Sequence, residues 1–189
     1  SNAFGAAPNA LESFGGKLWA ALASGQVWSF DGASWTQNAG LTAGALRAMR
    51  AYAGRLYVGD DSGRVWAYEP SLDRWYIATQ TASVAIESLG VYDGRLFVGA
   101  NPNVYVFNGT AWDLSFSPSA AVNALASFSN ALFAATNNSG IVFRFDGLSW
   151  TTSLDATESE VTALGIQGGR LYAGAGNPSN GRLYAFDGR

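Results

Sequence analysis

The chain has 189 residues, of which 48% are hydrophobic and 13% are charged, a composition typical of a folded domain rather than a disordered one. The formal net charge is -3 and Lys17 is the single lysine, which argues against nucleic acid, because a phosphate-binding face needs clustered Lys and Arg. Cys and His are absent, which excludes disulfides and leaves only oxygen ligands for a metal. No apolar run approaches the roughly 18 residues that a membrane span needs.

The first residues carry little of the fold. Ser1, Asn2 and Ala3 resemble the remnant of a cleaved affinity tag, so this chain is expected to be a piece of a longer protein. Residues 4–10 include Pro8 and are predicted to be an entry strand or loop. We therefore treat residues 4–189 as one domain.

A short alternating segment followed by a Trp returns at a nearly fixed interval. Its Trp residues are Trp35, Trp75, Trp112 and Trp150, which are 40, 37 and 38 residues apart. A fifth copy of the segment occupies 183–188, without a Trp after it. A fixed period in this range is the signature of a repeat architecture.

Each repeat contains four short apolar segments, which we name strands a, b, c and d. In the first repeat they cover 10–14, 17–22, 27–30 and 35–37. The repeats lie near 10–37, 45–79, 84–117, 121–154 and 160–187. Two-residue turns that favour positive φ angles separate strands a and b. These turns are Gly15-Gly16, Ala53-Gly54, Asp93-Gly94, Ser129-Asn130 and Gly168-Gly169.

Strand a also carries a column of small residues, one in each repeat. The column consists of Ala10, Ala48, Ser88, Ala124 and Ala163. Only small side chains fit where several sheets converge on an axis, while strand d carries Trp. The increase in side-chain size from strand a to strand d predicts an all-β fold, a five-bladed β-propeller of four-stranded repeats of about 38 residues. The alternative is an open or oligomerised arc, since closure of the ring would depend on residues 4–9 acting as a shortened strand d of the last blade.

Parts of the repeats resemble two propeller families. Residues 54–59, with Trp75 after them, are similar to Kelch-type blades, and 31–35 and 146–150 are similar to the Asp-box turns of sialidase-like propellers. A Kelch blade has a Gly pair after strand b, which this chain lacks, and an Asp-box has a Ser where this chain has Phe30 or Phe145. These resemblances imply a fold and leave the function open.

Most residues that could bind a ligand or act in catalysis are expected to have a structural role instead. The seven Trp residues are expected in the core, and the Asp and Asn at 31, 108, 146 and 187 are expected to accept backbone hydrogen bonds in c–d turns. Because some five-bladed propellers are glycosidases with paired acids, we tested the acids of strand a. By alignment Glu12 corresponds to Arg50, and Glu87 corresponds to Arg47, with which it is expected to form an ion pair.

The acid pairs in loops are expected to be turns or solvated surface. They are Asp60 with Asp61, and Glu158 with Glu160. The sequence therefore predicts no enzyme, no metal and no cofactor. It predicts a non-catalytic binding or interaction module. The alternatives are a glycosidase-like or lectin-like propeller that acts on carbohydrate, and an accessory domain of a larger secreted enzyme.

The predicted binding face lies at the end of the blades where strand a starts and where b–c and d–a loops connect the strands. There the repeats differ most, and variation on a regular scaffold is where recognition is expected. The residues predicted at the mouth of the central channel are Arg47, Glu87, Asn123 and Thr162. Those predicted in the b–c loops are Asp60, Asp61, Asn101, Asn103, Asn137, Asn138, Asn177 and Asn180.

These loops contain no aromatic residue on which a sugar ring could stack. That favours a protein or a polar small ligand as the partner over a lectin role, with neither nucleic acid nor a membrane span. The alternative is that the Asn residues only form turns. The protein is expected to be a monomer, in an extracellular or cell-surface setting.

Overall fold

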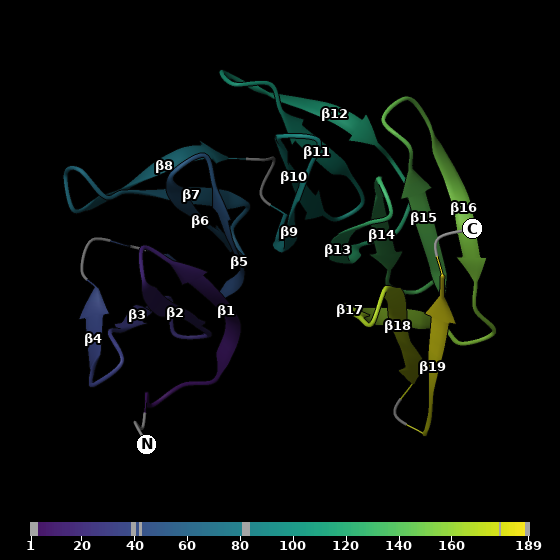
Figure 1. Ribbon diagram of the computed structural model, residues 1–189, viewed down its shortest axis with the longest axis horizontal. Helices are drawn as coiled ribbons and strands as arrows, with labels where there is room; N and C mark the ends of the chain where they lie inside the picture. Colours follow the sequence, from purple (N-terminus) through teal and green to yellow (C-terminus); the bar gives the residue numbers. More distant parts are fainter. Residues whose placement is uncertain (1–3, 39–40, 42, 81–83, 178, 188–189) are drawn as a thin grey trace. The chain divides into compact units, whose positions relative to one another are not determined.

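A computed structural model describes residues 4–38, 41, 43–80, 84–177 and 179–187 (Figure 1). The chain divides into two compact units, 1–89 and 90–189. All regular elements in the described ranges are β-strands. Within those ranges, no helix has the length and apolarity needed to cross a membrane.

The first unit contains two complete antiparallel sheets, each of four strands in chain order. The first sheet consists of β1 (Pro8–Phe14), β2 (Lys17–Leu22), β3 (Val27–Phe30) and β4 (Trp35–Asn38). The second consists of β5 (Leu46–Tyr52), β6 (Arg55–Asp60), β7 (Arg64–Glu69) and β8 (Arg74–Gln80).

The division between the units falls within β9 (Ile86–Tyr92), the first strand of the third sheet. This sheet continues with β10 (Arg95–Ala100), β11 (Val104–Phe107) and β12 (Trp112–Phe116). The fourth sheet consists of β13 (Val122–Phe128), β14 (Ala131–Thr136), β15 (Ile141–Phe145) and β16 (Trp150–Asp155). The fifth has three strands among the described residues: β17 (Glu160–Gln167), β18 (Arg170–Asn177) and β19 (Asn180–Phe186).

The predicted hairpin turns between the first two strands of each sheet are confirmed. All ten residues of the five turns have positive φ, from 47° at Ala53 to 75° at Gly54. Two successive residues in this region give the turn a twist that matches the twist of the strands it joins. The dipeptides therefore fix where each sheet begins to fold back.

Aromatic side chains fill the space between successive sheets of a unit. In the first unit Trp19, Trp66 and Trp75 belong to one buried cluster with Met49. In the second unit Phe133 is buried in a cluster with Val142, Leu171 and Ala173. Burial of such side chains contributes about 1.5–3 kcal/mol each, so the periodic aromatic residues form the core as predicted.

Residues 4–9 lie against the first sheet. Pro8 and Asn9 are part of β1, and the ring of Phe4 makes edge contacts with Trp28 at 5.5 Å and Trp35 at 5.0 Å. The structure thus gives these residues contacts within their own unit. Closure of the ring through residues 4–9 stays a prediction.

Candidate binding face

A β-bulge interrupts the first strand of at least four sheets. The pairing of the first two strands shifts register between Pro8 and Ala10, and again between Leu46 and Ala48. The same shift occurs in β13 and β17. A bulge inserts one extra residue and re-aims its side chain. The residues at the four bulges are Asn9, Arg47, Asn123 and Thr162, and Glu87 holds the corresponding position in β9.

Two of these bulge residues hydrogen-bond to the backbone of the next sheet. Asn9 Nδ2 donates to the carbonyl oxygen of Leu46 at 2.7 Å. In the second unit Asn123 Nδ2 donates to the carbonyl oxygen of Val161 at 3.5 Å. Each acceptor directly precedes the next bulge residue. Sequence analysis identified Asn123 but missed Asn9, although Asn9 likewise precedes a member of the small-residue column.

The predicted pairing of Glu87 with an Arg is confirmed. Arg47 Nη1 lies 3.2 Å from Glu87 Oε2, and the two side chains are 41% and 25% exposed. An ion pair this exposed contributes at most about 1 kcal/mol, so it orients the two side chains more than it stabilises the fold. Thr162 is exposed, and its hydroxyl donates to the Gly174 carbonyl at 3.4 Å.

Recurring backbone hydrogen bonds place the loop between the second and third strands beside the start of the first strand. The amides of Ala23, Asp61 and Asn137 each begin such a loop. They donate to the carbonyls of Ala7, Ala45 and Ala121, each at 2.9 Å. The acceptor stands two residues before the bulge in all three sheets. Bulge residues and b–c loops therefore share one end of the strands, as predicted, and we call this the loop end.

Asp60 requires a correction, because it is not a surface loop residue. It ends β6 and is fully buried. Its Oδ1 accepts the amides of Ser62 and Arg64, both at 2.9 Å, and its Oδ2 accepts the indole N–H of Trp66 at 3.0 Å. Asp60 thus organises the turn and anchors a core Trp, and it cannot contact a partner.

The neighbouring Asp61 is exposed and lies close to Gly44. A Cβ on Gly44 would come within 2.0 Å of Asp61 Oδ1, so the d–a loop approaches the b–c loop at this point. Asp61 Oδ1 also accepts a hydrogen bond from Ser62 Oγ at 3.3 Å. Asp61 is thus an exposed residue of the loop end whose carboxylate contacts both the b–c and the d–a loop.

The predicted Asn residues of the b–c loops separate into two groups. Asn177 accepts the amides of Ser179 and Asn180 at 3.0 Å, and Asn103 bonds the Tyr105 hydroxyl and Ser117, so these residues form turns. Asn177 and Asn180 are nevertheless exposed, as are Asn101, which precedes a cis Pro102, and Asn138, which has a φ of 59°. Asn137 is half-buried. The exposed members are the ones that remain candidates for recognition.

The acids tested for catalysis are both engaged by Arg. Glu12 Oε2 lies 3.8 Å from Arg50 Nη1, and Glu87 pairs with Arg47 as described. Both carboxylates of strand a that were considered as catalytic acids are therefore ion-paired.

Glu158 was expected to be solvated and is instead 8% exposed. Its carboxylate accepts the Tyr184 hydroxyl at 2.6 Å and pairs with Arg182 Nε at 3.0 Å. The hydrogen bond from Tyr184 is the main cause that lowers the pKa of Glu158, and burial opposes it. This acid therefore orients β19. Among the described residues, no three Asp or Glu side chains gather closely enough to hold a metal ion.

No protein-family model matches the sequence, and no curated protein matches it. Solved structures match it by fold. The structure of the RRP9 WD40 repeats matches with a TM-score of 0.81 and 15% sequence identity, and the match covers 100% of this chain and 62% of the RRP9 chain. The fold is a five-bladed β-propeller. The computationally designed Ika8 protein matches with a TM-score of 0.73 and 17% sequence identity, and the match covers 96% of this chain and 58% of the Ika8 chain. YCF48 from Cyanidioschyzon merolae matches with a TM-score of 0.71 and 14% sequence identity, and the match covers 98% of this chain and 71% of the YCF48 chain.

The propeller therefore spans about three fifths of the length of RRP9 and Ika8. Identities this low show the fold alone, and they leave the Kelch-like or Asp-box-like subtype as a prediction. Each of the five sheets corresponds to one blade. The gathering of Arg47, Glu87, Asn123 and Thr162 around one channel also stays a prediction.

Proposed function

We propose that the protein is a non-catalytic binding module that uses the loop end of its blades, formed by the bulge residues with the b–c and d–a loops. One observation carries this proposal. The same bulge recurs on a regular backbone, and it presents three kinds of side chain at four bulges: Asn9 and Asn123, Arg47, and Thr162. A constant scaffold with variable, exposed side chains is how loops carry recognition without disturbing a core.

The chemistry of this face favours a polar partner. Its exposed groups include the Arg47 guanidinium, the Asp61 carboxylate and the Asn138 amide. Together they offer a positive charge, a negative charge, and hydrogen-bond donors and acceptors. The b–c loops contain no aromatic ring, so a stacked sugar has no platform there. We therefore infer a protein surface or a polar small ligand as the partner, and we rank the carbohydrate-acting alternatives second.

The test compares variants at opposite ends of the strands. The protein is immobilised, partners are captured from an extract of the source cells, and recovery is quantified by mass spectrometry. Arg47→Ala and Asn138→Ala at the loop end should each reduce recovery of a specific partner about tenfold, the effect of an interface contact worth about 1.4 kcal/mol. Lys17→Ala, which also removes one exposed positive charge but next to an a–b turn, should leave recovery unchanged. Recovery that depends on Lys17 and not on the loop end would move the site to the other end.

The absence of catalysis is tested separately. Wild-type protein should hydrolyse neither glycoside nor sialoside substrates. Turnover by the wild type that disappears in Glu12→Ala or Glu87→Ala would overturn the non-catalytic assignment and restore the glycosidase-like alternative.

A further inference from the structure

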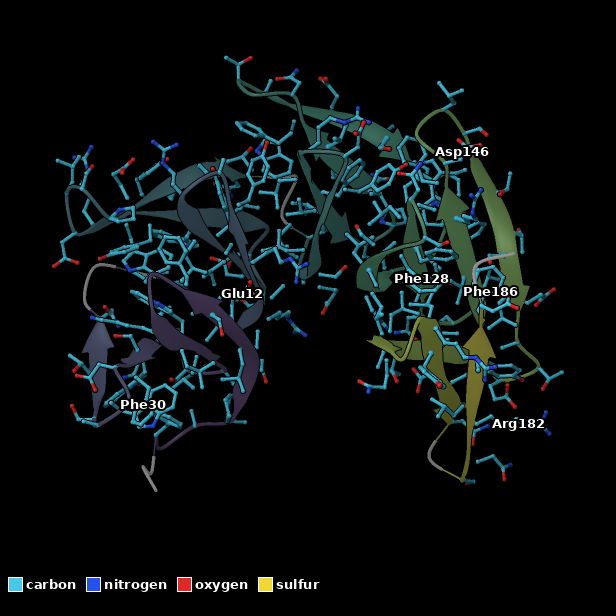
Figure 2. All side chains as sticks on the ribbon, viewed as in Figure 1. Glu12, Phe30, Phe128, Asp146, Arg182 and Phe186 are labelled. Atoms are coloured by element: carbon cyan, nitrogen blue, oxygen red, sulfur yellow. The ribbon has the colours of Figure 1, made fainter. Side chains whose placement is uncertain are left out.

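The c–d turn of the second blade departs from the pattern of the other complete blades. In the first, third and fourth blades, four residues separate the last aromatic residue of strand c from the Trp of strand d, whereas six separate Tyr68 from Trp75. Where the second blade has Tyr68, the others have Phe30, Phe107 and Phe145 (Phe30 is labelled in Figure 2). A longer turn and an added hydroxyl on a regular scaffold are differences of the kind that carry function.

Hydrogen bonds hold this longer turn in place. Arg55 Nε donates to Glu69 Oε2 at 2.8 Å, and Ser71 Oγ donates to Glu69 Oε1 at 2.9 Å. Near the end of the turn Asp73 has a φ of 46°, and its Oδ1 accepts the hydroxyl of Tyr68 at 2.5 Å. The two additional residues therefore bring a carboxylate back to the end of strand c.

This carboxylate lines a cavity of about 220 Å³ between the first two blades. The first blade contributes residues of β4 to the walls, and the second blade contributes residues of β7, β8 and the turn between them, all within the first unit. The lining residues are Thr36, Gln37, Asn38, Tyr68, Asp73 and Trp75. A water molecule occupies about 30 Å³ in the liquid, so the cavity is large enough for a small organic ligand.

Two polar side chains of this cavity already use their hydrogen-bond donors within the protein. The Tyr68 hydroxyl donates to Asp73, and burial followed by this carboxylate raises the pKa of Tyr68 to about 12, so the phenol keeps its proton at neutral pH. The Asn38 amide nitrogen donates to Ser29 Oγ and to the Thr36 carbonyl, each at 3.2 Å. An amide nitrogen has two hydrogens, so neither is left for a ligand.

The cavity therefore offers mainly acceptors and one negative charge. The free polar atom of Asn38 is Oδ1, and Asp73 Oδ2 accepts no hydrogen bond from the described residues. The N–H of Trp75 is buried and does not reach the surface. Asp73 is the only charged residue among those that line the cavity, and no ion pair of the described residues includes it. A matching ligand has to supply donors and a positive charge.

We propose that this cavity binds the primary ammonium group of an alkylamine, which donates hydrogen bonds to Asp73, Asn38 and Tyr68. The alkyl chain lies against the rings of Tyr68 and Trp75, whose centroids are 5.2 Å apart, and aromatic rings attract a nearby cation. A neutral sugar would leave the charge of Asp73 unbalanced. The same ammonium group occurs on free amines and on lysine side chains. The site shares no residue with the loop end, so it does not depend on the function proposed above.

The test titrates butylammonium chloride to millimolar concentration into the ¹⁵N-labelled full chain at constant ionic strength, and backbone amide shifts are followed by NMR. We expect saturable shifts around 36–38, 68 and 73–75, and none with 1-butanol, which has the same alkyl chain and no charge. No saturable shifts, or equal shifts with both compounds, would overturn the proposal. The peptide acetyl-Gly-Lys-Gly-amide distinguishes the sources: tighter binding than butylammonium identifies a lysine of a partner protein, and weaker binding identifies a free amine.

Matched variants locate the ammonium group. Asp73→Asn should weaken butylammonium binding about tenfold, because it removes the charge and keeps an oxygen for the Tyr68 hydroxyl. Tyr68→Phe, which introduces the side chain of the other blades, should weaken it about threefold. Asp31→Asn removes one charge from the shorter c–d turn of the first blade and should leave the affinity unchanged. Equal affinity in wild type and Asp73→Asn would place butylammonium elsewhere and overturn the site.

Discussion

The two ends of the strands in each unit are built differently. At one end, which we call the turn end, the a–b turns share positive φ at both residues. The c–d turns there also repeat one pattern, in which the side-chain oxygen of Asp31, Asn108 or Asp146 accepts two backbone amides at 2.8–3.0 Å. At the loop end the bulge recurs, but its residue changes from Asn to Arg to Thr.

The difference separates folding from recognition. Positive φ angles fix the backbone of all five a–b turns, and paired amides fix the c–d turns of three blades, so the backbone conformation of these turns is uniform although their residues differ. At the loop end the side chains of Asn9 and Asn123 repeat one hydrogen bond to the next sheet, whereas the contacts that hold the b–c loops are made by backbone groups, such as the amides of Ala23, Asp61 and Asn137. Backbone hydrogen bonds do not depend on the identity of the side chain, so side chains there are free to vary.

The largest expected effect separates two neighbouring acids of one b–c loop. Asp60→Ala should lower the free energy of unfolding by about 3 kcal/mol, since it leaves the Trp66 indole and two backbone amides without an acceptor in a buried site. Asp61→Ala should change it by less than about 0.5 kcal/mol, as is usual for an exposed position. Urea unfolding of the two variants measures both values. Equal, small losses would show that the Asp60 network does not hold the loop.

A smaller effect is expected at the turn end. Ser129 and Asn130 have φ angles of 47° and 58°, values that Asn followed by Gly adopts most readily in a two-residue hairpin. The double change Ser129→Asn and Asn130→Gly should stabilise the protein by about 1 kcal/mol. In the corresponding turn of the fifth blade, Gly168→Ala should destabilise it by a similar amount, because φ there is 56°. Thermal unfolding of both variants checks the opposite signs.

The c–d turns should make stability depend on pH. Hydrogen bonds from the amides of Ser34 and Ala33 lower the pKa of Asp31, and those of Ser149 and Leu148 lower the pKa of Asp146 (Asp146 is labelled in Figure 2). A carboxyl with a lowered pKa in the folded state stabilises the fold fully above its unfolded pKa of about 4, and loses this contribution as pH falls through the folded value.

Replacement of both acids by Asn keeps the acceptor oxygen that Asn108 already uses in the third blade. The double variant Asp31→Asn, Asp146→Asn should therefore lose less stability than wild type between pH 6 and about pH 3. The reverse change, Asn108→Asp, should steepen the loss. Urea midpoints at the two pH values give the comparison, and parallel pH profiles for all three proteins would contradict it.

The sequence predicted the repeats and the turn end because both depend on local residue types. Glycine pairs and Asp-Gly steps indicate turns wherever they stand, the Trp period located four blades, and the repeated segment at 183–188 located the fifth. The bulges were missed because a bulge is a property of the register between two strands. Asn9 was therefore overlooked, although four residues at equivalent positions were named.

The sequence also did not reveal that Asp60 and Glu158 are buried. Asp60 and Asp61 look alike in the sequence, yet only Asp60 is buried, because its carboxylate meets the indole of a Trp six residues later. Glu158 is buried because Tyr184, in a strand 26 residues later, donates to it. These contacts join residues from different strands, so the pattern of one strand does not reveal them.

The central claim is that partners bind at the loop end, and one matched pair of residues tests it directly. Asn138 and Asn130 are both exposed, have φ angles of 59° and 58°, and lie just beyond opposite ends of β14. Because the chain has no Cys, Asn138→Cys and Asn130→Cys can each be labelled with a benzophenone maleimide and photo-crosslinked in an extract of the source cells. The account predicts a specific crosslinked partner from position 138 and none from position 130. A partner captured only from position 130 would contradict it.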